Sequence, residues 1–291
     1  IMIDRTAPEV SVSYENNNVV NGRYFQSGRT AVVTVNDRNI DKDNVRITVY
    51  ATVGLGRSVG GTYTVDELNR IMGAYGISAR WLSDSNEGVR EADRTQDRSC
   101  RLSITFGSSG GRIFDCAYSQ IAVECTDLAG RNSRNTSYSG QTPHEFTVDH
   151  TPPVVRVTYT NDGAQISPGT SEGSQLYRQG SITMQVQIDE LNFGTGQNTV
   201  WTVNGQTRAI GFVSAGTIRT GTLTFSEDGH YVTGFGYTDM AGNEANVIAS
   251  AYFTVDNQAP SDGAVTIEPF GTWSSFSGFT NFSRSDSLTG S

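Results

Sequence analysis

Short segments in which apolar and polar residues alternate recur along most of the chain. Residues 9–14 (EVSVSY) have this period of two, and so do residues 154–159 (VVRVTY). Alternation of this kind is typical of β-strands with one buried face. Gly, Asn and Asp separate the segments at short intervals, which favours a β-sandwich. The pattern therefore predicts an all-β protein.

Strand-like segments follow one another in the same order in both halves of the chain. The first half has them at residues 9–14, 30–35, 45–50, 102–106, 121–125 and 145–148. The second half has them at residues 154–159, 182–188, 199–203, 223–225, 231–237 and 251–255. The shared order predicts two copies of one fold.

Two repeated phrases place the boundaries between these copies. Asp-x-x-x-Pro occurs at residues 4–8, 149–153 and 256–260, and Thr-Asp-x-Ala-Gly occurs at residues 126–130 and 238–242. Internal repetition is informative because it sets the unit of folding. We predict one domain at residues 1–149 and another at residues 150–257. Residues 258–291 are interpreted as the truncated start of a third unit or as a tail.

The first domain is longer because of an insertion at about residues 54–99. Thr64 and Glu67 have the spacing of a capping box, in which each side chain bonds the other residue's backbone amide. Leu68 begins the apolar face of the predicted helix, and Gly76 supplies its stop. The helix is interpreted either as packing on the sandwich or as a lid or partner-binding element.

Charge and hydropathy exclude two classes of partner. The chain has 30 acidic and 21 basic side chains and a net charge of −9, which argues against nucleic acid because a phosphate backbone requires a basic surface. No run of about 18 apolar residues is present, so no membrane insertion is expected. The chain opens on Ile1 rather than Met and is interpreted as a piece of a longer protein.

Three cysteines, Cys100, Cys116 and Cys125, lie in the first domain. An odd number leaves at least one thiol that is free or paired outside the chain. Both a Cys100–Cys125 disulfide and three reduced thiols fit the sequence.

The ordered set of phrases resembles the bacterial Ig-like domains of long secreted or surface-attached proteins. The resemblance covers about residues 4–260, and the first domain departs from it at Cys116-Ala117, at Arg131 and through its insertion. It implies two tandem Ig-like β-sandwiches, the first with a helix-containing insertion, in an extracellular or cell-surface protein. The phrases that carry it are Asp-x-Thr-x-Pro at 4–8 and 149–153, Asp-Gly-His-Tyr at 228–231, and Thr-Asp-x-Ala-Gly-Asn at 238–243.

The implied topology brings three carboxylates to one pole of each sandwich. Such oxygen-rich groups suit Ca²⁺, which accepts six to eight hard ligands, and an ion beside the linker would stiffen the joint. The alternative is that these aspartates cap turns and hold the linker backbone. The predicted trios are Asp4, Asp37 and Asp127 in the first domain, and Asp149, Asp189 and Asp239 in the second. Asp37 and Asp189 are matched because each lies nine residues after a glycine.

An enzyme is not predicted. His144, His150 and His230 have no nucleophile motif near them, and no Cys/His metal spacing is present. No pair of carboxylates can be assigned across a cleft, as a glycosidase requires.

The favoured function is a non-enzymatic spacer whose partners are neighbouring Ig-like domains of the same chain. The alternative is an adhesin module that binds a host protein or glycan through the first-domain insertion. An exposed apolar patch bearing Trp81 would favour the alternative, whereas a buried helix face would favour the spacer. Trp201 is expected in the core of the second domain. The aromatic residues of the tail, 270–282, fit either a binding stripe or a cut-off third domain.

Overall fold

The computed structural model describes residues 4–54, 56–85, 87–88, 98–109, 111–134, 144–194 and 198–259. In this part of the chain the protein is mostly β-strand, with one short α-helix, so the predicted all-β class is confirmed. Residues 1–257 form one compact unit. Two separate hydrophobic cores lie within that unit, one built from residues 10–148 and the other from residues 155–255. The proposed third unit and the aromatic residues of the tail lie outside the described residues.

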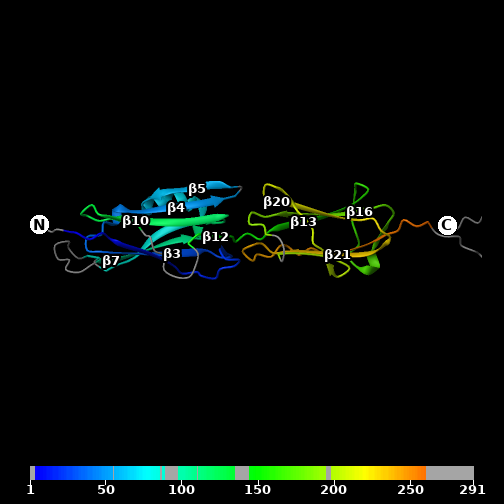
Figure 1. Ribbon diagram of the computed structural model, residues 1–291, viewed down its shortest axis with the longest axis horizontal. Helices are drawn as coiled ribbons and strands as arrows, with labels where there is room; N and C mark the ends of the chain where they lie inside the picture. Colours follow the sequence, from blue (N-terminus) through cyan, green and yellow to red (C-terminus); the bar gives the residue numbers. More distant parts are fainter. Residues whose placement is uncertain are drawn as a thin grey trace, which may run out of the picture. The chain divides into compact units, whose positions relative to one another are not determined.

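The first core lies between two four-stranded sheets, of order β1-β3-β7-β6 and β11-β10-β4-β5 (Figure 1). Neighbouring strands in both sheets are antiparallel. The strands are β1 (Glu9–Tyr14), β3 (Arg29–Asp37), β4 (Val45–Val53), β5 (Arg57–Tyr63), β6 (Ile77–Asp84), β7 (Arg98–Phe106), β10 (Tyr118–Thr126) and β11 (Asn132–Arg134). Together with the two-residue strands β2 (Tyr24–Phe25) and β12 (Thr147–Val148), which pair in parallel, they form the first sandwich.

The second core lies between two five-stranded sheets, of order β14-β13-β16-β20-β19 and β15-β22-β21-β17-β18. These strands form the second sandwich, and β15 pairs in parallel with β22 as β2 does with β12. The strands are β13 (Val154–Asn161), β14 (Ala164–Ile166), β15 (Leu176–Arg178), β16 (Ile182–Asp189), β17 (Thr199–Val203), β18 (Gln206–Thr207), β19 (Val213–Ala215), β20 (Ile218–Phe225), β21 (Gly229–Tyr237) and β22 (Ala251–Val255).

Alternation along the strands decides which residues enter the cores. In β1 the apolar positions Val10, Val12 and Tyr14 are buried, while the residues between them are partly exposed. Trp201 on β17 is fully buried and meets the ring of Phe235 edge-on, with 5.5 Å between centroids. The expected core position of Trp201 is confirmed.

The insertion extends both sheets of the first sandwich. It supplies β5, α1 (Val65–Met72) and β6, and the helix contacts both of these strands as well as β4. The capping box is present, because the Glu67 amide donates to Thr64 Oγ1 and the Thr64 amide donates to Glu67 Oε2. Leu68 and Met72 are buried in the first core. The helix therefore packs on the sandwich, as the first of the two interpretations states.

All three cysteines are buried free thiols, so the Cys100–Cys125 disulfide is not formed. Among the described residues, no helix combines the length and the apolar character that crossing a membrane requires.

Burial of the helix face gives a direct test of its structural role. Leu68 is fully buried and Ile71, on the next turn, is 38% exposed. Leu68→Ala should lower the free energy of unfolding by about 2–5 kcal/mol, because it leaves a cavity in the core. Ile71→Ala is the matched control and should change it by less than about 1 kcal/mol. Urea unfolding measures both, and equal losses would contradict a packing role for this face.

Candidate metal centre

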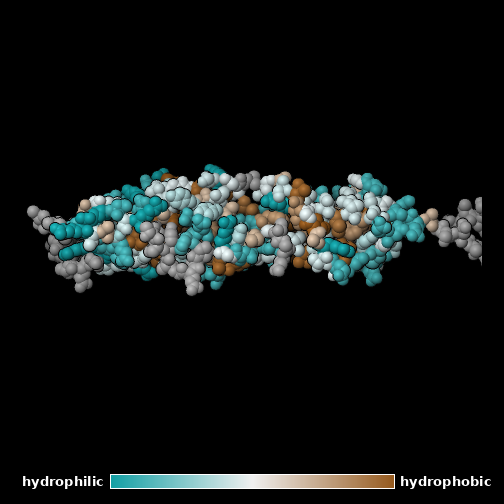
Figure 2. Space-filling view, in the orientation of Figure 1, coloured by the Kyte–Doolittle hydropathy of each residue, from teal (hydrophilic) through white to brown (hydrophobic). Residues whose placement is uncertain are grey.

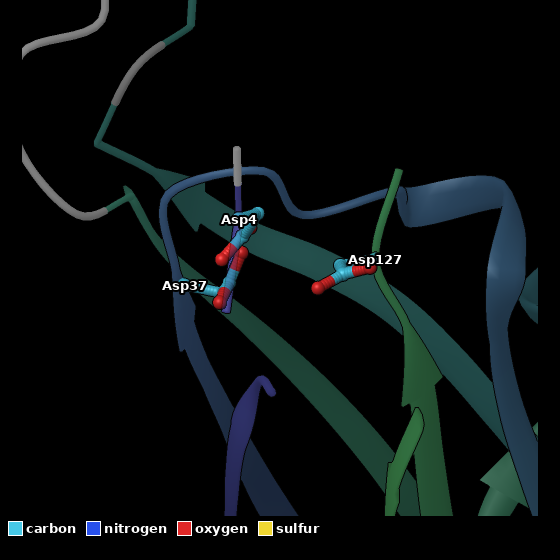
Figure 3. Close-up of side chains that lie close together, drawn as sticks. All are labelled: Asp4, Asp37 and Asp127. Carbon is cyan, nitrogen blue, oxygen red and sulfur yellow. The ribbon is translucent and has the colours of Figure 1, made fainter. Parts of the chain in front are cut away.

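Three acidic residues meet at one pole of the first sandwich, as the sequence predicts. Asp4 precedes β1, Asp37 ends β3, and Asp127 follows β10. One carboxylate oxygen of each lies within 4.8 Å of the others, and Figure 3 shows the three side chains directed toward a common space. Asp37 and Asp127 are buried, and Asp4 is partly exposed. We call this group the first cluster.

Backbone and amide donors hold the first cluster in place. Asn39 connects two of its members, since its backbone N–H donates to Asp37 Oδ1 at 2.6 Å and its Nδ2 donates to Asp4 Oδ2 at 2.6 Å. The Thr6 amide donates to Asp4 Oδ1 at 3.0 Å, and this bond is the main cause that lowers the pKa of Asp4. These donors favour the ionised carboxylates.

One oxygen of the first cluster, Asp127 Oδ2, lacks a partner among the described residues. Asp127 Oδ1 accepts the amides of Ala129 and Arg131, both at 2.8 Å, and so caps the turn that follows β10. Asp127 Oδ2 is buried without a hydrogen bond to any described residue. Leaving a buried charged oxygen unsatisfied costs more than about 1–3 kcal/mol, so a bound cation would remove a real penalty. The donor set therefore fits a metal ion.

The second sandwich has a corresponding group, with one residue different from the prediction. Its carboxylates lie within 4.8 Å of one another and belong to Asp149, Glu190 and Asp239. Each of these residues is at most 5% exposed. We call this group the second cluster. Asp189 is not a member of it. Its Oδ1 accepts a hydrogen bond from Thr217 Oγ1 at 2.5 Å, and it lines a cavity of about 310 Å³ together with Asp115, Asp149 and Glu190.

The period of the strand explains why Asp189 was the wrong choice. Ile182, Met184, Val186 and Ile188 point into the core, so the next inward position after β16 is Glu190, and Asp189 points outward. Asp37 and Asp189 both lie nine residues after a glycine, but Asp37 is at an inward position of β3 and Asp189 is at an outward position of β16. A better signal was present, because an asparagine follows two residues after the inward acid in both sandwiches.

That asparagine makes the same bonds in both clusters. The Asn192 amide donates to Glu190 Oε1 at 2.6 Å, and Asn192 Nδ2 donates to Asp149 Oδ2 at 2.8 Å. Asp239 Oδ1 accepts the amides of Ala241 and Asn243 at 2.8 Å, as Asp127 does in its own turn. The aspartates thus act as turn caps, as the alternative to a metal site states, and the carboxylates still meet at one point.

Burial dominates the electrostatics of the second cluster. It raises the pKa of Asp149 to about 6 and the pKa of Glu190 to about 8, and it also raises the pKa of Asp239. Within the described part of the chain, no basic side chain forms an ion pair with these three carboxylates. Three acids in such surroundings require either protons or a cation.

The second cluster lies where the two sandwiches are hydrogen-bonded to each other. Asn192 Nδ2 also donates to the Cys116 carbonyl of the first sandwich at 3.1 Å. Further along the junction, Asn21 Nδ2 donates to the Met240 carbonyl at 2.9 Å, and Gln26 Nε2 donates to the Gly242 carbonyl at 3.2 Å. Both carbonyls belong to the turn that Asp239 caps.

Comparison with protein-family models and with curated proteins finds no match for this chain. Its function is therefore argued from the geometry of the two clusters and of the junction.

The raised pKa values predict how stability depends on pH when divalent cations are removed by a chelator. Glu190 and Asp149 bind protons in the folded state at pH values where the unfolded chain does not, so stability increases as the pH falls from 8 to 5. The melting temperature should rise by roughly 5 °C or more over that range. Glu190→Gln should remove most of the slope, and Asp189→Asn should preserve it. An unchanged slope in the glutamine variant, measured by calorimetry, would show that Glu190 is not the group involved.

Proposed function

We propose that the chain is a non-enzymatic spacer, made of two tandem Ig-like sandwiches from a large extracellular bacterial protein, with a junction stiffened by Ca²⁺. The observation that carries this proposal is the double attachment of Asp149. Its amide donates to the Phe25 carbonyl of the first sandwich at 3.0 Å. Its side chain and its carbonyl accept from Asn192 and Asn243 of the second sandwich. One residue is thus part of both sandwiches.

Strand order supports the Ig-like assignment. An Ig sandwich packs strands A-B-E-D against C-F-G. The sheet β1-β3-β7-β6 has the order A-B-E-D, and the neighbours β4 and β10 of the other sheet have the order C-F. The second sandwich carries a buried Trp201 on its third long strand. Many Ig-like sandwiches have a tyrosine corner, in which a Tyr hydroxyl bonds the backbone a few residues upstream. Tyr231 has such a bond, because its hydroxyl donates to the Glu227 carbonyl at 2.8 Å. The corresponding Tyr118 donates to the Gln120 side chain instead.

The ends of the two sandwiches support neighbouring domains of the same chain as partners. The Asp256 amide donates to the Arg178 carbonyl at 3.0 Å, which repeats the bond of Asp149. The Asn257 amide donates to Asp228 Oδ1 at 2.7 Å, and the His150 amide donates in the same way to Asp115 Oδ1. Each sandwich therefore ends with the same arrangement of donors and carboxylates, which suits a serial array.

Calcium is the cation that the donor set favours. The groups that both clusters offer are carboxylate oxygens. Hard oxygen ligands in irregular geometry suit Ca²⁺, whereas Zn²⁺ prefers nitrogen and sulfur. An ion in the second cluster would neutralise charges that now belong to both sides of the junction.

An adhesive role for the insertion has less support. Leu68 and Met72 of α1 are buried, and Trp81 packs against the first core with Lys42 Nζ 5.2 Å from its ring centroid. On the face shown in Figure 2, apolar residues occupy separate small areas among polar ones. Residues 89–97 of the insertion lie outside the described part of the chain.

Calcium should stabilise the folded protein. At a concentration 100 times its Kd, Ca²⁺ should add about 2.7 kcal/mol to the free energy of unfolding, compared with chelator. Asp239→Asn should reduce this gain more than Asp189→Asn does, since Asp189 lines the same cavity but lies outside the second cluster. Thermal unfolding in CaCl₂ and in chelator measures the difference, and identical midpoints would overturn the calcium part of the proposal.

The junction gives a second test, which is made in chelator so that calcium plays no part, because Asn192 also bonds members of the second cluster. Asn192→Ala removes the bond to the Cys116 carbonyl, so the two sandwiches should tumble more independently in solution. Asn39→Ala is the matched control, because Asn39 has the same role in the first cluster but makes no bond across the junction. NMR relaxation of backbone amides in each sandwich reports the tumbling. Equal effects of the two substitutions would contradict a stiff joint at Asn192.

A further inference from the structure

Besides the exchange of Asp37 for Glu190, the two clusters differ at the last residue of the turn that Asp127 or Asp239 caps. In the second cluster this residue is Asn243, whose Nδ2 donates to Asp239 Oδ2 at 2.8 Å and to the Asp149 carbonyl at 3.0 Å. In the first cluster it is Arg131, whose Nε donates to the Asp4 carbonyl at 3.1 Å. The two side chains thus bond corresponding carbonyls, those of Asp4 and Asp149.

Only one of the two residues also satisfies its neighbouring carboxylate. Asn243 Nδ2 donates to Asp239 Oδ2. The equivalent oxygen, Asp127 Oδ2, receives no bond from Arg131 and is buried without a partner among the described residues. The first cluster therefore has an oxygen that is available to a metal ion. It also has a permanent positive charge beside it, because the Arg131 guanidinium is hydrogen-bonded to Asp4.

The surroundings of the second cluster are more negative. Asn243 is neutral, and Asp115 adds a further carboxylate, because it lines the same cavity as Asp149 and Glu190. Attraction between a divalent cation and a carboxylate group grows with the net negative charge and with the exclusion of water. Both conditions are stronger at the second cluster, since its members are buried and Asp4 is partly exposed.

We propose that the residue at this position sets the cation affinity of each cluster, so that Arg131 makes the first cluster the weaker Ca²⁺ site and Asn243 makes the second the stronger one. The inference rests on the proposed function, because it assumes that both clusters bind Ca²⁺. The second cluster, at the joint between the two sandwiches, then binds Ca²⁺ at a lower concentration than the first cluster does.

Calorimetric titration of the full chain with CaCl₂, after treatment with chelator, tests this assignment. The wild-type protein should show two classes of site, and Asp4→Asn should remove the weaker class. Asp4 suits this purpose because it is the least buried member of the clusters. Arg131→Asn should tighten the weaker class by roughly tenfold, the effect of one nearby charge in partly solvated surroundings.

Arg134→Asn is the matched control, because it changes the net charge equally on the neighbouring strand β11. Arg134 pairs with Glu124, with 3.5 Å between Nη1 and Oε1, and is not a member of either cluster. Its substitution should leave both affinities within about twofold of wild type. Melting of each variant in chelator verifies that it is folded.

The outcomes separate this inference from the proposed function. If Ca²⁺ binds but Arg131→Asn has the same affinities as wild type, the role of Arg131 is overturned and the calcium sites remain. If Asp4→Asn removes the tighter class, the order of the two sites is wrong. If no variant binds Ca²⁺, both this inference and the calcium part of the proposed function are overturned.

Discussion

The structure depends on an aspartate whose backbone belongs to one sandwich and whose carboxylate belongs to the next. The Asp149 amide completes the parallel pairing of β2 and β12, because it donates to the carbonyl of Phe25. Its carboxylate is nevertheless buried against Asn192, at the far side of the junction. A single hydrogen-bonded residue thereby fixes where the chain leaves one core and where the next begins. The short parallel strands explain this position, since they end beside the residue that must cross.

Grouping three carboxylates in one buried place opposes folding unless their charge is balanced. Desolvation of an ionised carboxylate costs several kcal/mol, and amide donors recover only part of that cost. In the first sandwich the donors are Asn39 and the 127–131 turn. In the second they are Asn192 and the 239–243 turn. These bonds orient the oxygens but do not remove the negative charge. Protons or a divalent cation must do so, and that requirement couples stability to solution conditions.

Much of the fold could be predicted from the sequence, because its signals are local. Alternation located β1, β17 and β22 with the bounds that the structure has, and the capping box located the start of α1. The first cluster was also predicted in full. The strands of the insertion were missed because β5 contains two adjacent glycines and lacks a clear alternation. The parallel pairs were missed because two or three residues carry no period.

Asp189 differs from Asp37 in the direction of its side chain, and the equal spacing of the two residues from a glycine does not reveal that difference. In a strand, a shift of one residue moves every side chain to the other face. A glycine marks a bend but does not show which residues of the next strand point inward. The alternating run of buried apolar residues does show it.

The repeated Asp-x-x-x-Pro phrase is for this reason more than a boundary marker. A division between residues 149 and 150 separates Asp149 from Glu190 and Asp239, and so removes one member from the second cluster. The functional unit of the second sandwich accordingly starts at residue 149, within the last hydrogen bonds of the first. The two sandwiches share a residue at their joint, so charge at that joint acts on both folds at once. That sharing is the physical reason why a cation bound there would stiffen the connection rather than merely stabilise one domain.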